Sequence, residues 1–108
     1  MNTKTVTQTF QQGDVVGRKL DTMPEGKQTV IGRQTLVIAH GENGHSHVIE
    51  DDEAELVRIG ERMILTLTKA ATVKHEEHKA IRLSPGIWEI GRVREYDYFS
   101  LLTRQVID

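Results

Sequence analysis

The chain shows almost no helical periodicity, and this feature constrains its fold more than any other. Its apolar residues recur in short windows that alternate with polar residues or are rich in Val, Ile, Thr and aromatic side chains, a pattern typical of β-strands. Glycine, proline and acidic turns separate these windows. Eight to ten short strands in 108 residues predict an all-β domain, either a small antiparallel β-barrel or a two-sheet sandwich.

The strand predictions cover most of the chain. We expect strands over residues 3–10, 15–20, 34–40, 45–49, 54–59, 62–68, 71–75, 80–83, 87–96 and 98–107. Turns or loops are predicted at 11–14, 21–27, 41–44, Gly60 and Pro85-Gly86, and the acidic segment 50–53 is predicted to be a solvated hairpin tip. The one helical candidate, 51–58, competes poorly with the strand interpretation.

Length and composition limit the function. The 108 residues suit one domain, 1–108, and the hydrophobic fraction of 37% predicts a thin core without a large enclosed pocket. A net charge of -2 does not indicate binding to nucleic acid or to an anionic membrane. The absence of cysteine excludes disulfides and thiolate ligands. With no apolar run of about 20 residues and no secretory signal, we expect a soluble, cytoplasmic protein of a bacterial or phage-infected cell.

All five histidines fall between residues 40 and 78, in two clusters. The first contains His40, His45 and His47, and the second contains His75 and His78. Imidazole is the commonest side-chain ligand of transition metals. The distribution therefore predicts a single metal site, with zinc first and nickel, iron or manganese as further candidates.

Strand geometry explains how the first cluster would assemble. His45 and His47 lie two residues apart, so in a strand their rings face the same side. If residues 41–44 close a hairpin, His40 lies opposite His45 and Ile38 lies opposite His47. Three imidazoles would then crowd one end of a sheet face. His40 is the ligand that depends most on this register.

The second cluster adds carboxylates to the imidazoles. In His75-Glu76-Glu77-His78, the spacing of three places both rings on one side of a tight bend or helical turn. Glu76, Glu77 and also Glu42 are candidates to bind the metal, to accept an imidazole N–H or to move a proton. The competing interpretation is that the histidines are solvated surface residues paired with these acidic neighbours.

Several motifs together resemble a known family. They are Gln12-Gly13-Asp14-Val15, Gly41-Glu42-Asn43-Gly44-His45-Ser46-His47, His75-Glu76-Glu77-His78, Pro85-Gly86 and Arg94-Glu95-Tyr96-Asp97. In this order they resemble a family of small uncharacterised bacterial and phage proteins with the pattern QGDV…GExxGHxH…HEEH…PGxYxxxxxREY. The resemblance runs from about residue 11 to the C-terminus, with Trp88 in place of the usual Tyr and Val93 in place of a Gln. It implies a shared histidine site but no particular activity.

The His-x-His element is also similar, in part, to cupins. Cupin-like sites follow His-x-His with a carboxylate and a later histidine; here Glu50 follows His47 more closely than is usual, and His75 or His78 stands for the later histidine. This resemblance implies an open coordination position for water, oxygen or substrate.

Three functions remain open from the sequence. The first is a small zinc-binding β-domain that acts as an accessory or interaction protein, and we favour it because a thin core leaves little room for a deep pocket. The second is a metal-dependent enzyme in which Glu42, Glu76 or Glu77 moves a proton. The third is a metal-free module that binds a protein partner or forms a homodimer through an edge strand. A closed tetrahedral site would favour the first, and an open position the second.

Overall fold

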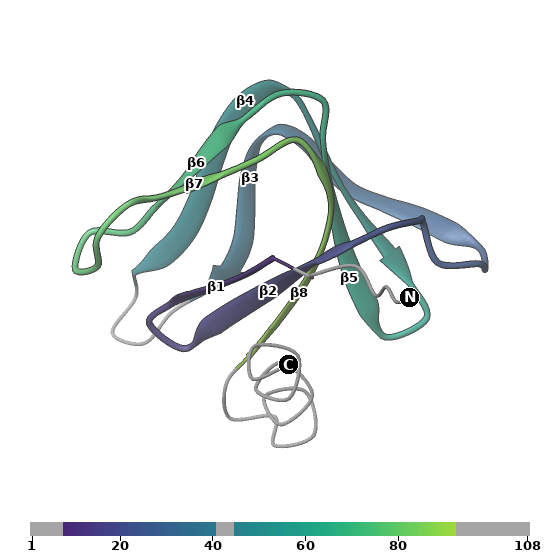
Figure 1. Cartoon of the computed structure of the whole chain (residues 1–108), viewed down its shortest axis with the longest axis horizontal. Helices are drawn as coiled ribbons and strands as arrows, with labels where there is room; N and C mark the ends of the chain where they lie inside the picture. The colour runs from purple at the N-terminus through teal and green to yellow at the C-terminus, as the bar shows by residue number, and fades with distance from the viewer. Residues whose placement is uncertain (1–7, 41–44, 93–108) are drawn as a thin grey trace, which may run out of the picture.

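The computed structural model describes residues 8–40 and 45–92, apart from the side chains of residues 39, 40 and 52. This part of the chain forms one nearly closed antiparallel β-barrel, which confirms the all-β prediction (Figure 1). Its eight strands are β1 Thr9–Gln12, β2 Val15–Leu20, β3 Gln28–His40, β4 Ser46–Ile59, β5 Arg62–Leu67, β6 Ala71–Lys74, β7 Ile81–Leu83 and β8 Gly86–Arg92.

The long strand β4 organises the sheet. The strands follow the order β1-β2-β8-β5-β4-β6-β7, and β3 pairs with β4. On its other side β4 changes partner along its length, because Val48 and Ile49 pair with β6 whereas residues 55–59 pair with β5. The sheet therefore divides near the middle of β4 into two arms, which curve around the interior (Figure 1).

The structure of residues 50–53, where the sheet divides, differs from the prediction. Residues 50–53 are not a solvated hairpin tip, and 51–58 is not helical, since both belong to the continuous strand β4. Asp51 is only 8% exposed, and its Oδ1 accepts the backbone N–H of Glu53 at 2.9 Å. Its carboxylate thus satisfies a backbone group at the division, which is a common use of Asp. The prediction of a solvated tip was wrong because this polar residue is buried.

The other boundaries agree with the sequence pattern in part. Strand β1 ends at Gln12, so the turn predicted at 11–14 begins after that residue, and residues 3–7 of the strand predicted at 3–10 lie outside the described residues. Strand β2 has the predicted bounds, and Gly60 forms the turn between β4 and β5 with a φ of 62°. Strand β3 is longer than predicted because it begins at Gln28 rather than at residue 34. The predicted turn 41–44, the strand 98–107 and the final residues of the strand 87–96 lie outside the described residues. In the part that is described, no helix is long and apolar enough to cross a membrane.

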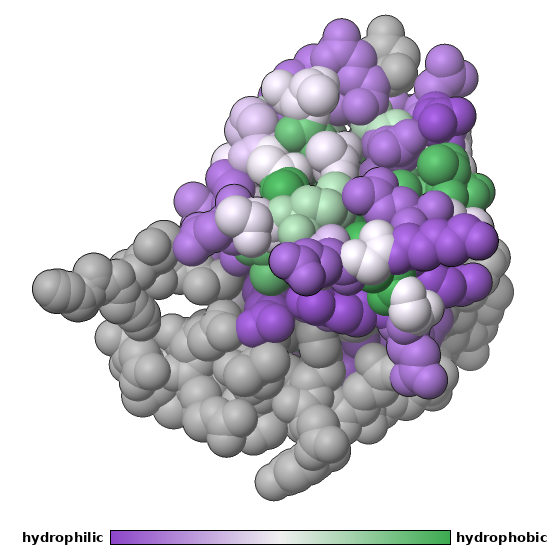
Figure 2. Space-filling view, turned by 90° about the vertical axis from the view of Figure 1, so that its right-hand side faces the viewer, coloured by the Kyte–Doolittle hydropathy of each residue, from purple (hydrophilic) through white to green (hydrophobic). Residues whose placement is uncertain are grey.

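The core consists of one main cluster and a smaller one. The main cluster fills the barrel, where Phe10 packs edge-on against Trp88 with ring centres 5.8 Å apart. The smaller cluster comprises Val57, Ile59 and Ile64, which are covered by the partly buried Leu20, Met23 and Ile87. One side of the surface carries mainly polar residues with small apolar patches between them (Figure 2).

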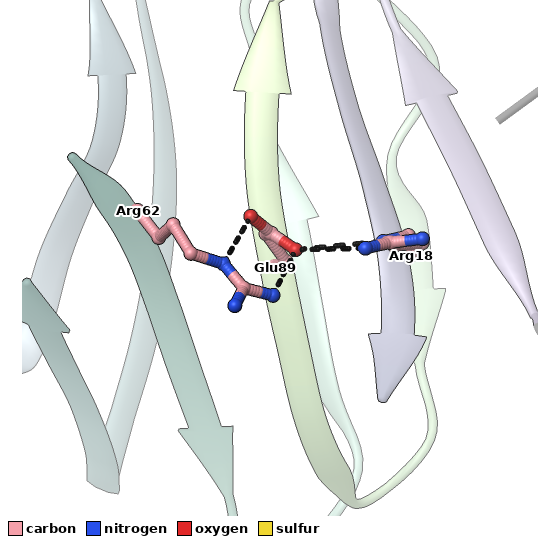
Figure 3. Close-up of polar contacts among 3 residues, drawn as sticks. All are labelled: Arg18, Arg62 and Glu89. Atoms are coloured by element: carbon pink, nitrogen blue, oxygen red, sulfur yellow. Dashed lines mark hydrogen bonds and ion pairs between the residues drawn. The ribbon is translucent and has the colours of Figure 1, made fainter. Parts of the chain in front are cut away.

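A charged group is buried on the central strand β8. Glu89 is only 7% exposed, and its carboxylate accepts hydrogen bonds at 2.9 Å from both Nε and Nη2 of Arg62 (Figure 3). Arg18 on the neighbouring β2 approaches the same carboxylate at 3.3 Å. Burial alone raises the pKa of Glu89, but the two guanidinium groups outweigh it and hold this pKa below its ordinary value of 4.5. Glu89 is therefore ionised and pins β8 to β5 and β2.

A single glutamine side chain spans the seam between the two ends of the sheet order. Gln12, on β1, is 2% exposed, and its Nε2 donates to the carbonyl oxygens of Val73 at 3.0 Å and Lys79 at 2.9 Å. Val73 belongs to β6, and Lys79 lies in the connection to β7. Gln12 therefore joins β1 to β6 and to the β6–β7 connection, at the end of the barrel where the histidines lie.

Candidate metal centre

Four histidines from two distant segments meet at one end of the barrel. His47 lies on β4 and is 1% exposed, and His45 directly precedes this strand. His75 and His78 belong to the β6–β7 connection. The ring centres are 4.4 Å apart for His47 and His75, 4.6 Å for His75 and His78, 5.7 Å for His45 and His75, and 6.4 Å for His47 and His78. The start of β4, the β1–β2 turn and the β6–β7 connection lie together at the left of Figure 1.

The predicted register of the first cluster is wrong. His40 pairs with Ser46 rather than His45, and His47 faces Ala39 rather than Ile38. The cause is an irregularity between Val37 and Ala39, which shifts the ladder by one residue. The side chain of His40 and the whole of Glu42 lie outside the described residues, so neither is placed in this site.

A hydrogen bond fixes which nitrogen of His47 carries its proton. Because Gln12 Nε2 donates to two carbonyl groups, its Oε1 must face His47, and Nδ1 of His47 lies 2.8 Å from that oxygen. An amide oxygen only accepts, so Nδ1 carries the hydrogen. In the neutral ring this leaves Nε2 with a lone pair. Such a partner on the distal nitrogen is usual for metal-binding histidines.

The surroundings of His47 favour its neutral form. Burial contributes most to lowering the pKa of His47, and the neighbouring His75 lowers it further. The carboxylate of Asp14 opposes this effect but does not reverse it. His47 is therefore a neutral imidazole at pH 7, which is the form that binds metals.

Asp14 completes this part of the cluster. Its Oδ1 lies 3.6 Å from Nε2 of His47, and its Oδ2 accepts a hydrogen bond from Nη1 of Arg92 at 2.9 Å. The sequence pattern predicted a turn at 11–14 and placed Gln12 and Asp14 in a family motif, but it did not identify either residue as part of the site. Their place in the Gln12-Gly13-Asp14-Val15 motif was the signal that could have identified them.

His45 is held between two carboxylates. Its Nδ1 forms an ion pair with Glu76, and its Nε2 lies 3.2 Å from Oε2 of Glu77. Both glutamates are mostly exposed. Glu76 and Glu77, which the sequence placed near the histidines, thus contact His45 directly.

The remaining two rings have different surroundings. Nδ1 of His75 accepts the backbone N–H of Glu77 at 3.0 Å. The ring of His78 lies against Gly13, so closely that a Cβ at position 13 would be 2.7 Å from its Nε2. Gly13 also has a φ of 61°. The turn therefore needs glycine both for its backbone conformation and for space beneath His78.

The donor atoms do not form a complete coordination sphere. Among the residues with described side chains, no three His, Asp or Glu groups already surround a common point at metal-binding distance. Completing one requires rotation of exposed rings such as His78. Glu50 lies on the outer face of β4 near Lys74, at 4.0 Å, so it is not beside His47. An open cleft borders His75 and Glu76 and is also lined by Ser46, Val48, Glu50 and Lys74.

Comparisons with known proteins identify the family of the chain. No curated protein and no solved structure matches it. One family model, described as Domain of unknown function (DUF8820), matches residues 11–93. This match covers β1 from Gln11 onward and every later strand that the structure describes. The chain therefore belongs to the DUF8820 family.

Proposed function

We propose that this protein is a small metal-binding β-domain that holds one divalent transition metal ion at the histidine cluster and acts as an accessory or interaction protein. Zinc is the first candidate, and nickel, iron and manganese also accept imidazole ligands. The observation that carries the proposal is the convergence of four imidazoles on one end of the barrel, from two segments far apart in sequence.

The spacing of the rings supports this proposal. A metal ion lies about 2.0–2.1 Å from an imidazole nitrogen, so two rings on one ion have centres about 4.5–5.5 Å apart. The ring of His75 lies 4.4 Å from that of His47 and 4.6 Å from that of His78, close to this range, whereas the rings of His47 and His78 are 6.4 Å apart. Rotation of the exposed His78 side chain, without movement of the strands, would bring its nitrogen and that of His47 to a common ion.

The electrostatics of the cluster support the same conclusion. Beyond the effect of burial, His75 and His78 lower the pKa of His47, so positive charges on neighbouring rings disfavour one another. A bound metal ion would take the place of protons on these rings and would tie β4 to the β6–β7 connection. Because the ion binds the folded chain preferentially, it would stabilise the fold.

A metal-dependent enzyme is the second candidate, and the open cleft favours it. This cleft reaches His75 and Glu76, so a small molecule could approach the cluster from the outer side of β4 and β6. Glu76 would then be the group that moves a proton. The partial resemblance to cupins implies the same open position, although Glu50 lies away from His47 and does not supply the expected carboxylate.

The test is direct measurement of metal binding. Purified protein is stripped with chelator and titrated with Zn²⁺ in a calorimeter, and we expect one ion per chain. His47→Ala should weaken binding by more than about 100-fold, beyond the 10–100-fold effect typical of outer-sphere residues. Glu50→Gln is the matched control on the outer face of the same strand and should bind as the parent protein does. Failure of the parent protein to bind any of the four metals at one per chain would refute the proposal.

A further inference from the structure

We infer that Asp14 is itself a ligand of the ion, so that the site is a two-histidine, one-carboxylate centre formed by His47, His78 and Asp14. This inference rests on the proposed function and specifies its ligand set. It assigns a metal-binding role to the β1–β2 turn, which the histidine pattern alone did not suggest.

The distance between the donor atoms of His47 and Asp14 is close to that of two donors bound to one metal ion. Two donor atoms that each lie about 2.1 Å from one metal are about 3.0 Å apart at a right angle and about 3.4 Å apart at the tetrahedral angle. Nε2 of His47 and Oδ1 of Asp14 are separated by 3.6 Å, which is too long for a hydrogen bond. Because the proton of His47 is on Nδ1, a lone pair and a carboxylate oxygen face each other across this gap. A cation between them would turn this repulsion into attraction.

Arg92 prepares Asp14 for this role. It occupies Oδ2 at 2.9 Å and leaves Oδ1 directed toward His47. A carboxylate held by one oxygen in this way is suited to bind a metal through the other. Gln12 orients His47 from the opposite side. Each of the two donors therefore has its own support.

His78 is the third donor because of its position on the turn. Its Nε2 lies against Gly13, the residue next to Asp14. The rings of His47 and His78 are nearly parallel, at 9°, and their centres are 6.4 Å apart, which is more than two rings on one ion require, so His78 has to rotate toward the gap to bind. His78 is exposed, so its ring is free to rotate toward the gap.

The rings of His45 and His75 already contact other groups in the protein. Both nitrogens of His45 face carboxylates, from Glu76 and Glu77. Nδ1 of His75 uses its lone pair to accept the N–H of Glu77, so in the neutral ring Nε2 carries the hydrogen. Both rings therefore already have partners, which leaves two imidazoles and one carboxylate. Such a set is suited to Fe²⁺ and Mn²⁺ as well as to Zn²⁺, and its open positions favour the metal-dependent enzyme, the second candidate, over a closed structural site.

The experiment compares metal affinity among single variants of the full chain. Asp14→Asn should weaken binding of Zn²⁺ and Co²⁺ by at least about 10-fold, as should His78→Ala, whereas His45→Ala should change it by less than about threefold. Asp21→Asn, an exposed aspartate in the loop after β2, is the matched control and should have no effect. Arg92→Gln removes the ion pair but keeps the carboxylate, so its effect should be smaller than that of Asp14→Asn.

A second measurement does not depend on the folding of any variant. The visible spectrum of Co²⁺ bound to the parent protein should change when azide is added, because three protein ligands leave at least one position for a water that the anion can replace. A cobalt spectrum that saturating azide leaves unchanged would overturn the inference. So would parental affinity in Asp14→Asn with binding lost in His47→Ala, an outcome that leaves the proposed function intact. Absence of binding by the parent protein would instead refute the proposed function.

Discussion

The contact between Gly17 and Phe10 gives a sharp test of how the barrel is packed. The two residues are paired across β1 and β2, and the aromatic ring lies directly over the glycine. A Cβ at position 17 would be 2.1 Å from Cε2 of Phe10 and 2.8 Å from two further ring atoms. Carbon atoms in ordinary contact are about 3.5–4.0 Å apart. Gly17→Ala therefore requires the ring to move by roughly 1.5 Å.

The magnitude follows from what the ring would lose. Overpacking of a core costs about 1–3 kcal/mol, and loss of the edge-on contact between Phe10 and Trp88 adds about 0.5–1.5 kcal/mol. We expect Gly17→Ala to lower the free energy of unfolding by about 2–4 kcal/mol, which corresponds to a fall in melting temperature of about 10–20 °C. Denaturant unfolding followed by circular dichroism measures the free energy of unfolding, and thermal unfolding followed in the same way measures the melting temperature.

A double-mutant cycle isolates the cause of this loss. Phe10→Leu removes the ring atoms that clash, so adding Gly17→Ala to this background should cost less than about 0.5 kcal/mol. Gly60→Ala is a useful comparison, because nothing lies within 4 Å of the added methyl group and only the φ of 62° at Gly60 opposes the change. This variant should lower the free energy of unfolding by about 1 kcal/mol. Equal costs of Gly17→Ala in both backgrounds would show that the reasoning about the ring is wrong.

Three further predictions test other parts of the molecule. Because Arg62 and Arg18 lower the pKa of Glu89, the stability that its carboxylate contributes is present above pH 4.5 and is lost as pH falls through the lower folded pKa. Glu89→Gln should therefore lower the free energy of unfolding by about 2 kcal/mol at pH 7. An equal loss at pH 7 and pH 3 in denaturant titrations would contradict this prediction. Gly13→Ala should destabilise the fold by about 1–2 kcal/mol, because position 13 has a positive φ and an added Cβ would clash with the His78 ring. Adding His78→Ala should restore only the stability lost to the clash. Full restoration would argue against backbone strain at position 13. Saturation with the bound metal at about 100 times its dissociation constant should add about 2.7 kcal/mol, which a chelator should remove in a thermal melt; an unchanged melting temperature would count against a site specific to the folded state.

The sequence predicted the fold class because local alternation and turn residues govern small antiparallel barrels. Strand β2 and the turn at Gly60 were confirmed for this reason. The segment around Asp51 was misassigned because a polar residue can face inward when it replaces a missing backbone partner. No local pattern indicates that replacement, since it depends on where the sheet divides.

The candidate site likewise divides into what local pattern predicts and what depends on long-range folding. The sequence showed two clusters of histidines, and the fold brings His45, His47, His75 and His78 together. The register of His40 was wrong because an irregularity in β3 cannot be read from alternation. The contribution of Asp14 depends on the closing of the barrel across its seam, a long-range event that residue spacing does not encode.

The irregularities of β3 have a consequence for the solubility of the protein. Val30, Ile31 and Val37 on this strand are 43–45% exposed, and within the described part of the chain β3 pairs only with β4. A straight apolar strand at a sheet border is a template for aggregation. Its ladder is interrupted at three places, and Gln34 has a φ of 71°. These breaks put the backbone groups along β3 out of phase after every few residues, so this strand is a poor template for a continuous ladder with an added chain.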